Sequence, residues 1–204
     1  MFINSPLLGE FNVENLLAAI AVLLAKKVDL NSIASRVNKV SSIDGRMERF
    51  TDENNATTIV DYAHTPDALR NALLACRPHC QGKLWLVFGC GGDRDQGKRA
   101  KMGAIAEQYS DHVIVTNDNP RSEDPIKISD DILSGCKYPE QVTVILPRQQ
   151  AVIDTLNKAK ANDLVLLAGK GHEDFIIHGN ERVAYNEREL VKSHYENLKN
   201  EVCK

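Results

Sequence analysis

The segment His112-Val113-Ile114-Val115-Thr116 leads through Asn117 into Asp118-Asn119-Pro120-Arg121. Valine, isoleucine and threonine favour a β-strand, and the proline ends the strand because it has no N–H to donate. In a parallel sheet the polar loop would lie at the carboxyl end of this strand, where open α/β sheets bind ligands. The guanidinium of Arg121 would match a carboxylate there. The alternative is an ordinary strand-to-helix turn, with Asp124-Pro125 opening the next helix.

Five short apolar segments have the composition of buried strands, and each but the last precedes a segment with helical spacing of apolar residues. The strand segments are residues 57–60, 84–88, 112–116, 142–146 and 164–168. After the first of them, Leu69, Leu73 and Cys76 recur on one face of a helix. This order predicts an α/β fold, a Rossmann-like and mostly parallel sheet with helices on both faces.

The first 44 residues have a different pattern from the rest of the chain. Residues 11–27 predict a helix that is apolar on nearly every side over residues 16–25, and residues 30–40 predict a shorter helix. Such an apolar helix is normally buried in a larger body. We therefore expect residues 1–44 to be the C-terminal helical remnant of a larger domain, and residues 45–204 to form the α/β domain.

Two further elements are expected near the C-terminus. Residues 175–177 and 182–184 predict a β-hairpin around the four residues His178-Gly179-Asn180-Glu181. A polar helix is predicted from Asn186 onward.

Composition limits the class of protein. The 204 residues are 43% hydrophobic and 26% charged, as in soluble globular proteins. The net charge of −3 argues against nucleic-acid binding. The longest apolar run, residues 16–25, is too short to cross a bilayer. With five cysteines, no C-x-x-C pair and no secretory signal, we expect free thiols and a cytoplasmic protein.

Four polar loops follow predicted strands, and the carboxyl ends of parallel strands meet at one edge of a sheet. The loops contain residues 61–64, 89–98, 118–121 and 169–173. Four such loops at one edge predict a ligand site. Two guanidinium groups, Arg94 and Arg121, together with the carboxylate of Glu173, complement an amino acid that carries additional carboxylate and ammonium groups. The imidazole of His172 can position an amine, although a histidine in a surface turn is the simpler account.

The glycine-rich loop 89–98 also invites comparison with phosphate-binding loops. Residues 92–98 fit the spacing G-x-x-x-x-G-K, but Arg99 stands where a Mg²⁺-binding serine or threonine is required. Asp93 and Asp95 would repel a phosphate, and Arg94 replaces the third glycine of the dinucleotide pattern. The favoured interpretation is that the loop presents Arg94 to a carboxylate, and a simple tight turn is the alternative.

At these loops the chain resembles the Mur ligase family, and within it the branch that adds meso-diaminopimelate during peptidoglycan synthesis. The resemblance runs over essentially the whole chain, and Asp118-Asn119-Pro120-Arg121 is the mark of that branch. It rests on residues 9–19, 45–50, 61–67, 89–98, 118–121 and 169–173. It implies an ATP-dependent ligase in which a carboxylate of a UDP-sugar dipeptide is phosphorylated and the amine of diaminopimelate attacks the acyl phosphate.

The resemblance implies two groups of binding residues. For meso-diaminopimelate these are Arg94, Asp118, Asn119, Pro120, Arg121, Gly169 and Glu173, with His172 positioning the amine. For ATP they are Asn12, Asn15, Arg46, Asp61, Tyr62 and His64. Without the resemblance, Asn15 would be taken as an amide on a helix surface and Arg46 as a solvated charge in a linker.

Other functional parts of the family are missing from the sequence. It has no true phosphate-binding loop, no Mg²⁺-binding glutamate, no lysine of the kind that becomes carbamylated and no UDP-binding domain. We therefore expect no catalytic residue and no metal ligand here, and no ligase activity from these 204 residues alone. ATP and Mg²⁺ would act in a longer enzyme, whose N-terminal and central domains are the expected partners, with no role for nucleic acid or membrane.

Two other functions stay open from the sequence. The second hypothesis is a stand-alone nucleotide-binding or phosphotransfer domain with a degenerate P-loop at residues 92–98. The third is a non-catalytic module that binds an amino acid.

Overall fold

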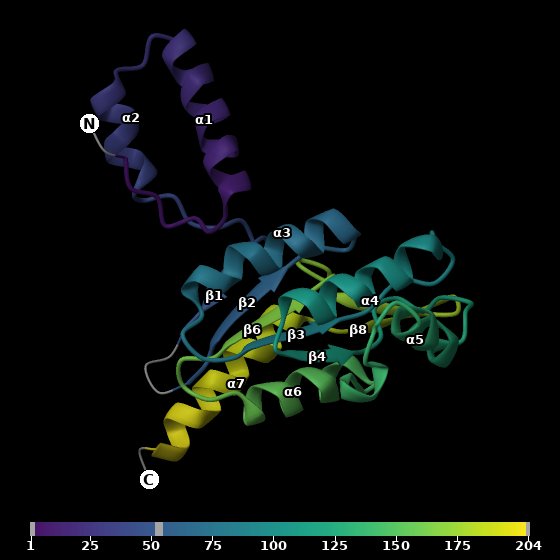
Figure 1. The fold of residues 1–204 in the computed structure, drawn as a ribbon. Helices are drawn as coiled ribbons and strands as arrows, with labels where there is room; N and C mark the ends of the chain where they lie inside the picture. The colour runs from purple at the N-terminus through teal and green to yellow at the C-terminus, as the bar shows by residue number, and fades with distance from the viewer. Residues whose placement is uncertain (1–2, 52–54, 203–204) are drawn as a thin grey trace.

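The structure, a computed structural model, describes residues 3–51 and 55–202, so Cys203 lies outside it. Its centre is a six-stranded sheet in the order β1-β2-β6-β3-β4-β5 (Figure 1). The strands are β1 (Glu48–Phe50), β2 (Thr57–Asp61), β3 (Leu84–Phe88), β4 (His112–Val115), β5 (Thr143–Val144) and β6 (Leu164–Ala168). All neighbours pair in parallel except β1, which runs antiparallel to β2.

Helices cover both faces of this sheet, which confirms the predicted architecture. One face carries α3 (Pro66–Cys76), α4 (Gly97–Tyr109) and α5 (Pro125–Leu133); the other carries α6 (Arg148–Lys158) and α7 (Glu187–Val202) (Figure 1). Side chains along a strand alternate between the two layers, so that Ile59 joins one core and Val60 the other. The inner strands β3 and β6 are apolar throughout because helices cover both of their faces, whereas the edge strands β1 and β5 are partly or fully exposed.

Three local expectations need correction. The edge strand β1 was not predicted, and β5 has two residues where the sequence predicted five. The hairpin strands β7 (Phe175–His178) and β8 (Glu181–Ala184) are longer than expected, so His178 pairs with Glu181 and the turn contains only Gly179 and Asn180. Gly179 has a φ of 57°, a value that glycine adopts easily and that permits this tight turn.

The N-terminal helices α1 (Glu10–Ala25) and α2 (Leu30–Val37) extend away from the sheet (Figure 1). The sequence predicted that this apolar helix belongs to a larger domain. In this chain α1 buries none of its residues, and Leu17 and Val22 are each 60% exposed. No second layer within residues 3–51 and 55–202 covers this surface. A domain boundary at residue 44 stays a prediction. Among all helices within residues 3–51 and 55–202, none is long and apolar enough to span a membrane.

A buried arginine links the ends of two strands that do not touch. The guanidinium of Arg148 donates to the carbonyl of Ala168 at 2.9 Å, at the end of β6, and to the carbonyl of Asn117 at 3.3 Å, just beyond β4. Strand β3 lies between β4 and β6. The carboxylate of Glu187, from α7, accepts from the same guanidinium at 2.7 and 3.1 Å. Burial alone would lower the pKa of Arg148, but Glu187 outweighs this effect and raises it.

Replacing Glu187 by glutamine should lower the free energy of unfolding by about 3–5 kcal/mol, because the buried Arg148 would keep its charge without a counter-ion. The matched control is Glu189→Gln, two residues along the same helix, where an exposed carboxylate pairs with Lys192. That change should cost less than about 1 kcal/mol. Urea unfolding followed by circular dichroism compares the two, and equal losses would show that the buried ion pair has no special importance.

Candidate functional site

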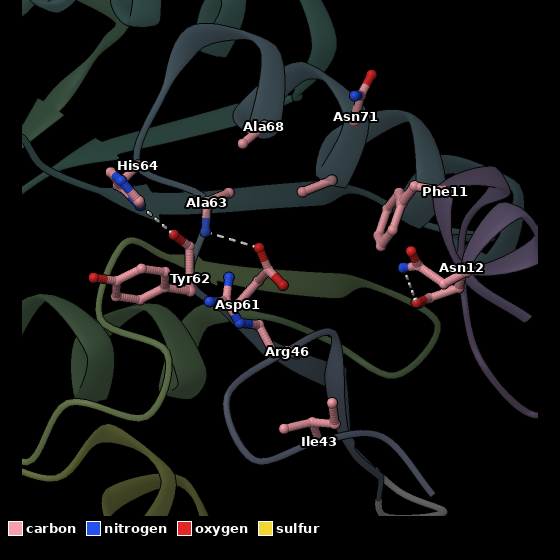
Figure 2. A pocket seen from close by; sticks show the side chains of 12 residues that line it. Phe11, Asn12, Ile43, Arg46, Asp61, Tyr62, Ala63, His64, Ala68 and Asn71 are labelled. Carbon is pink, nitrogen blue, oxygen red and sulfur yellow. Dashed lines mark hydrogen bonds between the residues drawn. The ribbon is translucent and has the colours of Figure 1, made fainter. Parts of the chain in front are cut away.

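One cavity of about 450 Å³ collects residues from separate parts of the chain (Figure 2). Its walls come from the start of α1, the segment before β1, the end of β2 with its following turn, and α3. All six residues predicted for ATP line it, namely Asn12, Asn15, Arg46, Asp61, Tyr62 and His64. Their role stays a prediction, but the structure places them around a single space.

Asp61 organises the centre of this cavity. It is the last residue of β2 and only 8% exposed. One carboxylate oxygen accepts from the backbone N–H of Met47 and the other from that of Ala63, each at 2.8 Å. Burial raises the pKa of Asp61 despite these two bonds. Each carboxylate oxygen has lone pairs left for another donor, such as a sugar hydroxyl.

A cluster of rings and a cation forms another wall. The guanidinium carbon of Arg46 lies 4.5 Å from the centre of the Tyr62 ring. That ring is also 4.7 Å from the ring of His64 and 5.3 Å from the ring of His172. Flat π surfaces beside a cation suit the stacking of a planar base and the attraction of an anion.

A second polar cluster joins loops 118–121 and 169–173. Its centre is Asn119, which is 4% exposed. The side-chain oxygen of Asn119 accepts from the N–H of Ile177 at 2.9 Å and from the ammonium of Lys170 at 3.1 Å. The side-chain nitrogen of Asn119 donates to Glu173 at 3.0 Å. Burial tends to raise the pKa of Glu173, but the hydrogen bonds from Lys170 and Asn119 outweigh it and lower the pKa.

The two predicted arginines flank Gly91 in the neighbouring loop. A methyl group added to Gly91 would lie 2.9 Å from a terminal nitrogen of Arg121 and 3.7 Å from the side chain of Arg94. Arg121 donates to the carbonyl of Gly92 at 2.8 Å, whereas Arg94 is exposed and donates only to the carbonyl of the preceding residue. Arg94 and Arg121 are thus neighbours, and Arg121 follows the asparagine that binds Glu173.

The geometry of residues 92–98 does not favour a phosphate-binding loop. Such a loop directs free N–H groups at the phosphate. Three N–H groups here already donate to acceptors in the chain at 2.6–2.9 Å, those of Gly92, Asp93 and Gly97. The ammonium of Lys98 donates to the carbonyl of His64 at 2.7 Å.

The cavity and the second cluster meet at a backbone contact. A methyl group on Gly45 would lie 2.2 Å from the carbonyl carbon of Gly171 and from the nitrogen of His172. The N–H of Gly169 donates to the carbonyl of Asp61 at 3.0 Å. Since Gly45 directly precedes Arg46, any shift of loop 169–173 reaches the cavity wall.

The described part of the chain contains no group of three or more histidine, cysteine, aspartate or glutamate side chains arranged to hold a metal ion. Cys76, Cys80, Cys90 and Cys136 are free thiols. The cavity residues fit a base and a sugar better than a cation, because only one of the lining residues is acidic.

Comparisons with known proteins identify the family of this chain. The family described as Mur ligase, glutamate ligase domain matches residues 45–171. The chain belongs to the Mur ligase family, as the sequence resemblance indicated. A solved structure of UDP-N-acetylmuramoyl-L-alanyl-D-glutamate–2,6-diaminopimelate ligase is 39% identical over 97% of this chain, with a TM-score of 0.76. The match covers 40% of that ligase, so this chain spans less than half of its length.

More distant structures share the fold alone. UDP-N-acetylmuramate-alanine ligase from Thermotoga maritima is 20% identical over 98% of this chain and 40% of its own, with a TM-score of 0.68. Folylpolyglutamate synthase from Mycobacterium tuberculosis, complexed with ADP and AMPPCP, is 22% identical over 82% of this chain and 39% of its own, with a TM-score of 0.65.

Sequence reasoning missed several residues at the site. Phe11 and Asn71 line the cavity, and Lys170 binds within the second cluster. Phe11 was taken only as the start of the helix predicted over residues 11–27, and Asn71 was not singled out. Lys170 had one indication in the sequence, its position between two glycines directly after a buried strand.

Replacing Gly45 by alanine should destabilise the chain by several kcal/mol more than a positive φ alone explains, because the new methyl group meets backbone atoms. The control is Gly179→Ala, since Gly179 has a similar φ of 57°, against 65° at Gly45, with nothing within 4 Å of the added methyl group. Thermal unfolding measures both variants, and NMR shifts of residues 169–173 should change only in Gly45→Ala. Equal losses of thermal stability in the two variants would show that the close backbone contact at Gly45 has no effect of its own.

Proposed function

We propose that this chain supplies the amino-acid site and part of the ATP site of a ligase that adds meso-diaminopimelate to UDP-N-acetylmuramoyl-L-alanyl-D-glutamate. The observation that carries this proposal is the position of Arg94, Arg121 and the Asn119–Glu173 pair at one edge of the sheet. The 39% identical structure of a ligase for 2,6-diaminopimelate supports it. ATP and Mg²⁺ act in the whole enzyme, which we place in the cytoplasm together with its UDP-sugar peptide substrate.

The amino-acid end of the site follows from charge. Arg94 and Arg121 bind the distal carboxylate of meso-diaminopimelate, a pairing that guanidinium forks favour. The distal ammonium lies at Glu173 and the backbone of Gly169. Asp118, Asn119 and Pro120 form the turn that holds Arg121 in place. His172 stands beside Tyr62, between the two ligand sites, where it positions the attacking amine.

The proposed positions of the parts of ATP follow from the shape of the cavity and from its polar side chains. Asn12 and Asn15 lie beside the adenine, Arg46 contacts the base and the ribose, and Asp61 accepts from the ribose hydroxyls. Tyr62 and His64 complete the wall. In the whole enzyme a carboxylate of the UDP-sugar dipeptide becomes an acyl phosphate, and the amine of meso-diaminopimelate displaces the phosphate to form the amide. We propose that these 204 residues bind ligands but do not catalyse this reaction by themselves.

Calorimetry should show that the chain binds meso-diaminopimelate more tightly than L-lysine. Lysine lacks the distal carboxylate and leaves two guanidinium groups without a partner, at a cost of about 1.5–3 kcal/mol, which is roughly ten- to hundredfold in affinity. Arg121→Ala should lose most of this preference. Arg36→Ala, in α2, is the control and should behave as the unaltered chain. Equal affinities for the two amino acids would contradict the substrate assignment.

Titration with Mg-ATP separates this function from the P-loop alternative. Arg46→Ala removes the cation over Tyr62 and should weaken nucleotide binding by about five- to thirtyfold, as expected for the loss of roughly 1–2 kcal/mol. Lys98→Ala should change it little, because the Lys98 ammonium binds a backbone carbonyl. The reverse pattern, with binding lost only in Lys98→Ala, would favour a phosphate-binding loop at residues 92–98.

A further inference from the structure

Lys170 is a lysine whose side chain is entirely buried in the loop after β6. Its ammonium donates to Glu173 at 2.6 Å and to the side-chain oxygen of Asn119 at 3.1 Å. It also lies 4.0 Å from a carboxylate oxygen of Asp118 and 5.7 Å from the centre of the Phe175 ring. A buried ammonium is tolerated only with such partners. Three of these partners, Asp118, Asn119 and Glu173, are among the residues proposed to surround the amino-acid ligand.

The glycines on either side of Lys170 fix its direction. Gly169 has a φ of 110° and Gly171 a φ of 51°, values that residues with a side chain rarely adopt. A methyl group on Gly169 would lie 2.8 Å from Asp118, and one on Gly171 would lie 2.8 Å from the carbonyl oxygen of Gly45. The backbone therefore has little room to turn, and the ammonium of Lys170 is held at the acidic side chains.

This arrangement gives Glu173 a cationic partner before any ligand arrives. One of its oxygens, Oε2, accepts from both Lys170 and Asn119. Asp118 and Glu173 carry two negative charges, and Lys170 cancels one of them. An incoming ammonium thus meets an acid that already has a cationic partner, whereas an incoming carboxylate meets the arginines Arg94 and Arg121.

We infer that Lys170 is a specificity-determining residue, whose ammonium occupies Glu173 in advance so that ligands are selected mainly by their distal carboxylate. The inference rests on the proposed function and extends it to the choice among amino acids. A ligand with only a distal ammonium, such as L-lysine, has to share Glu173 with Lys170. A ligand with a distal carboxylate binds the two arginines, and its affinity falls only a little if its distal ammonium is missing.

NMR titration of the unaltered chain with three ligands tests this inference, since the method measures millimolar affinities. They are meso-diaminopimelate, L-lysine and 2-aminopimelate, which keeps the distal carboxylate and lacks the distal ammonium. We expect 2-aminopimelate to bind within about fivefold of meso-diaminopimelate, and L-lysine to bind at least about tenfold more weakly than 2-aminopimelate. Binding of L-lysine as tight as that of 2-aminopimelate would overturn the inference.

Two variants test the role of Lys170 itself. Lys170→Met keeps the unbranched apolar stem, and Lys170→Gln keeps an N–H donor for Glu173 without the charge. In both, the affinity for L-lysine relative to 2-aminopimelate should rise by about tenfold, because the ammonium of the ligand replaces the missing one. A residue that only maintained the loop would weaken all three ligands together and leave that ratio unchanged.

The control is Lys192→Met. Lys192 also pairs with a glutamate three residues away, Glu189, at 2.8 Å, but both side chains are exposed. The Lys192→Met variant should bind the three ligands with the same order of affinities as the unaltered chain. Circular dichroism melting shows which variants are folded, and if neither Lys170 variant folds, the ligand order of the unaltered chain decides.

The outcomes separate the two proposals. A chain that responds to none of the three ligands contradicts the proposed function. A chain that prefers meso-diaminopimelate, but whose ratio of L-lysine to 2-aminopimelate affinity is the same with and without Lys170, contradicts only the inference about Lys170.

Discussion

The ion pair between Arg148 and Glu187 sets the spacing of the sheet edge on which the polar clusters depend. Arg148 binds the carbonyls of Asn117 and Ala168, the last residues before loops 118–121 and 169–173. Parallel strands bring their carboxyl ends to one edge, but β4 and β6 are not neighbours in the sheet. A buried guanidinium, neutralised by Glu187, links their ends directly and keeps the two loops at a fixed separation.

Asn119, in loop 118–121, likewise links separate segments of backbone beyond the ends of the strands. Its side-chain oxygen accepts from the N–H of Ile177, as a backbone carbonyl would, and the backbone of Arg121 exchanges hydrogen bonds with Ile177 and Gly179. The polar loop thereby acts as a short strand beside β7 and anchors the hairpin. Arg121 has a φ of 52°, uncommon for a residue with a side chain, and backbone strain of this kind concentrates at functional sites.

The residues assigned to ATP came from the family resemblance, and their role stays a prediction. Sequence patterns predicted the parallel sheet, its helices and the polar loops at one edge of the sheet, because apolar periodicity and short polar loops are local features. They failed where a distant partner decides the outcome. Arg148 and Lys170 were not singled out, since a charged residue in a sequence is assumed to face water until its counter-ion is known. Strand β1, Glu48–Phe50, has three residues, two of them charged, and only its pairing with β2 reveals it. Helix α7 looked polar, yet Val191 and Tyr195 are buried against the sheet.

The two ends of the site differ in how they are held. The loops around Lys170 and Asn119 belong to the sheet and are tied by buried hydrogen bonds, so their geometry is set when the α/β core folds. The cavity around Asp61 instead takes one wall from the start of α1, a helix that buries none of its residues. Only Leu8 and Phe11 at that end pack partly against the core. The shape of the cavity thus depends on where α1 lies relative to the sheet, while loops 118–121 and 169–173 are tied to the sheet itself. The two regions meet where Gly45, next to Arg46, contacts Gly171 in loop 169–173.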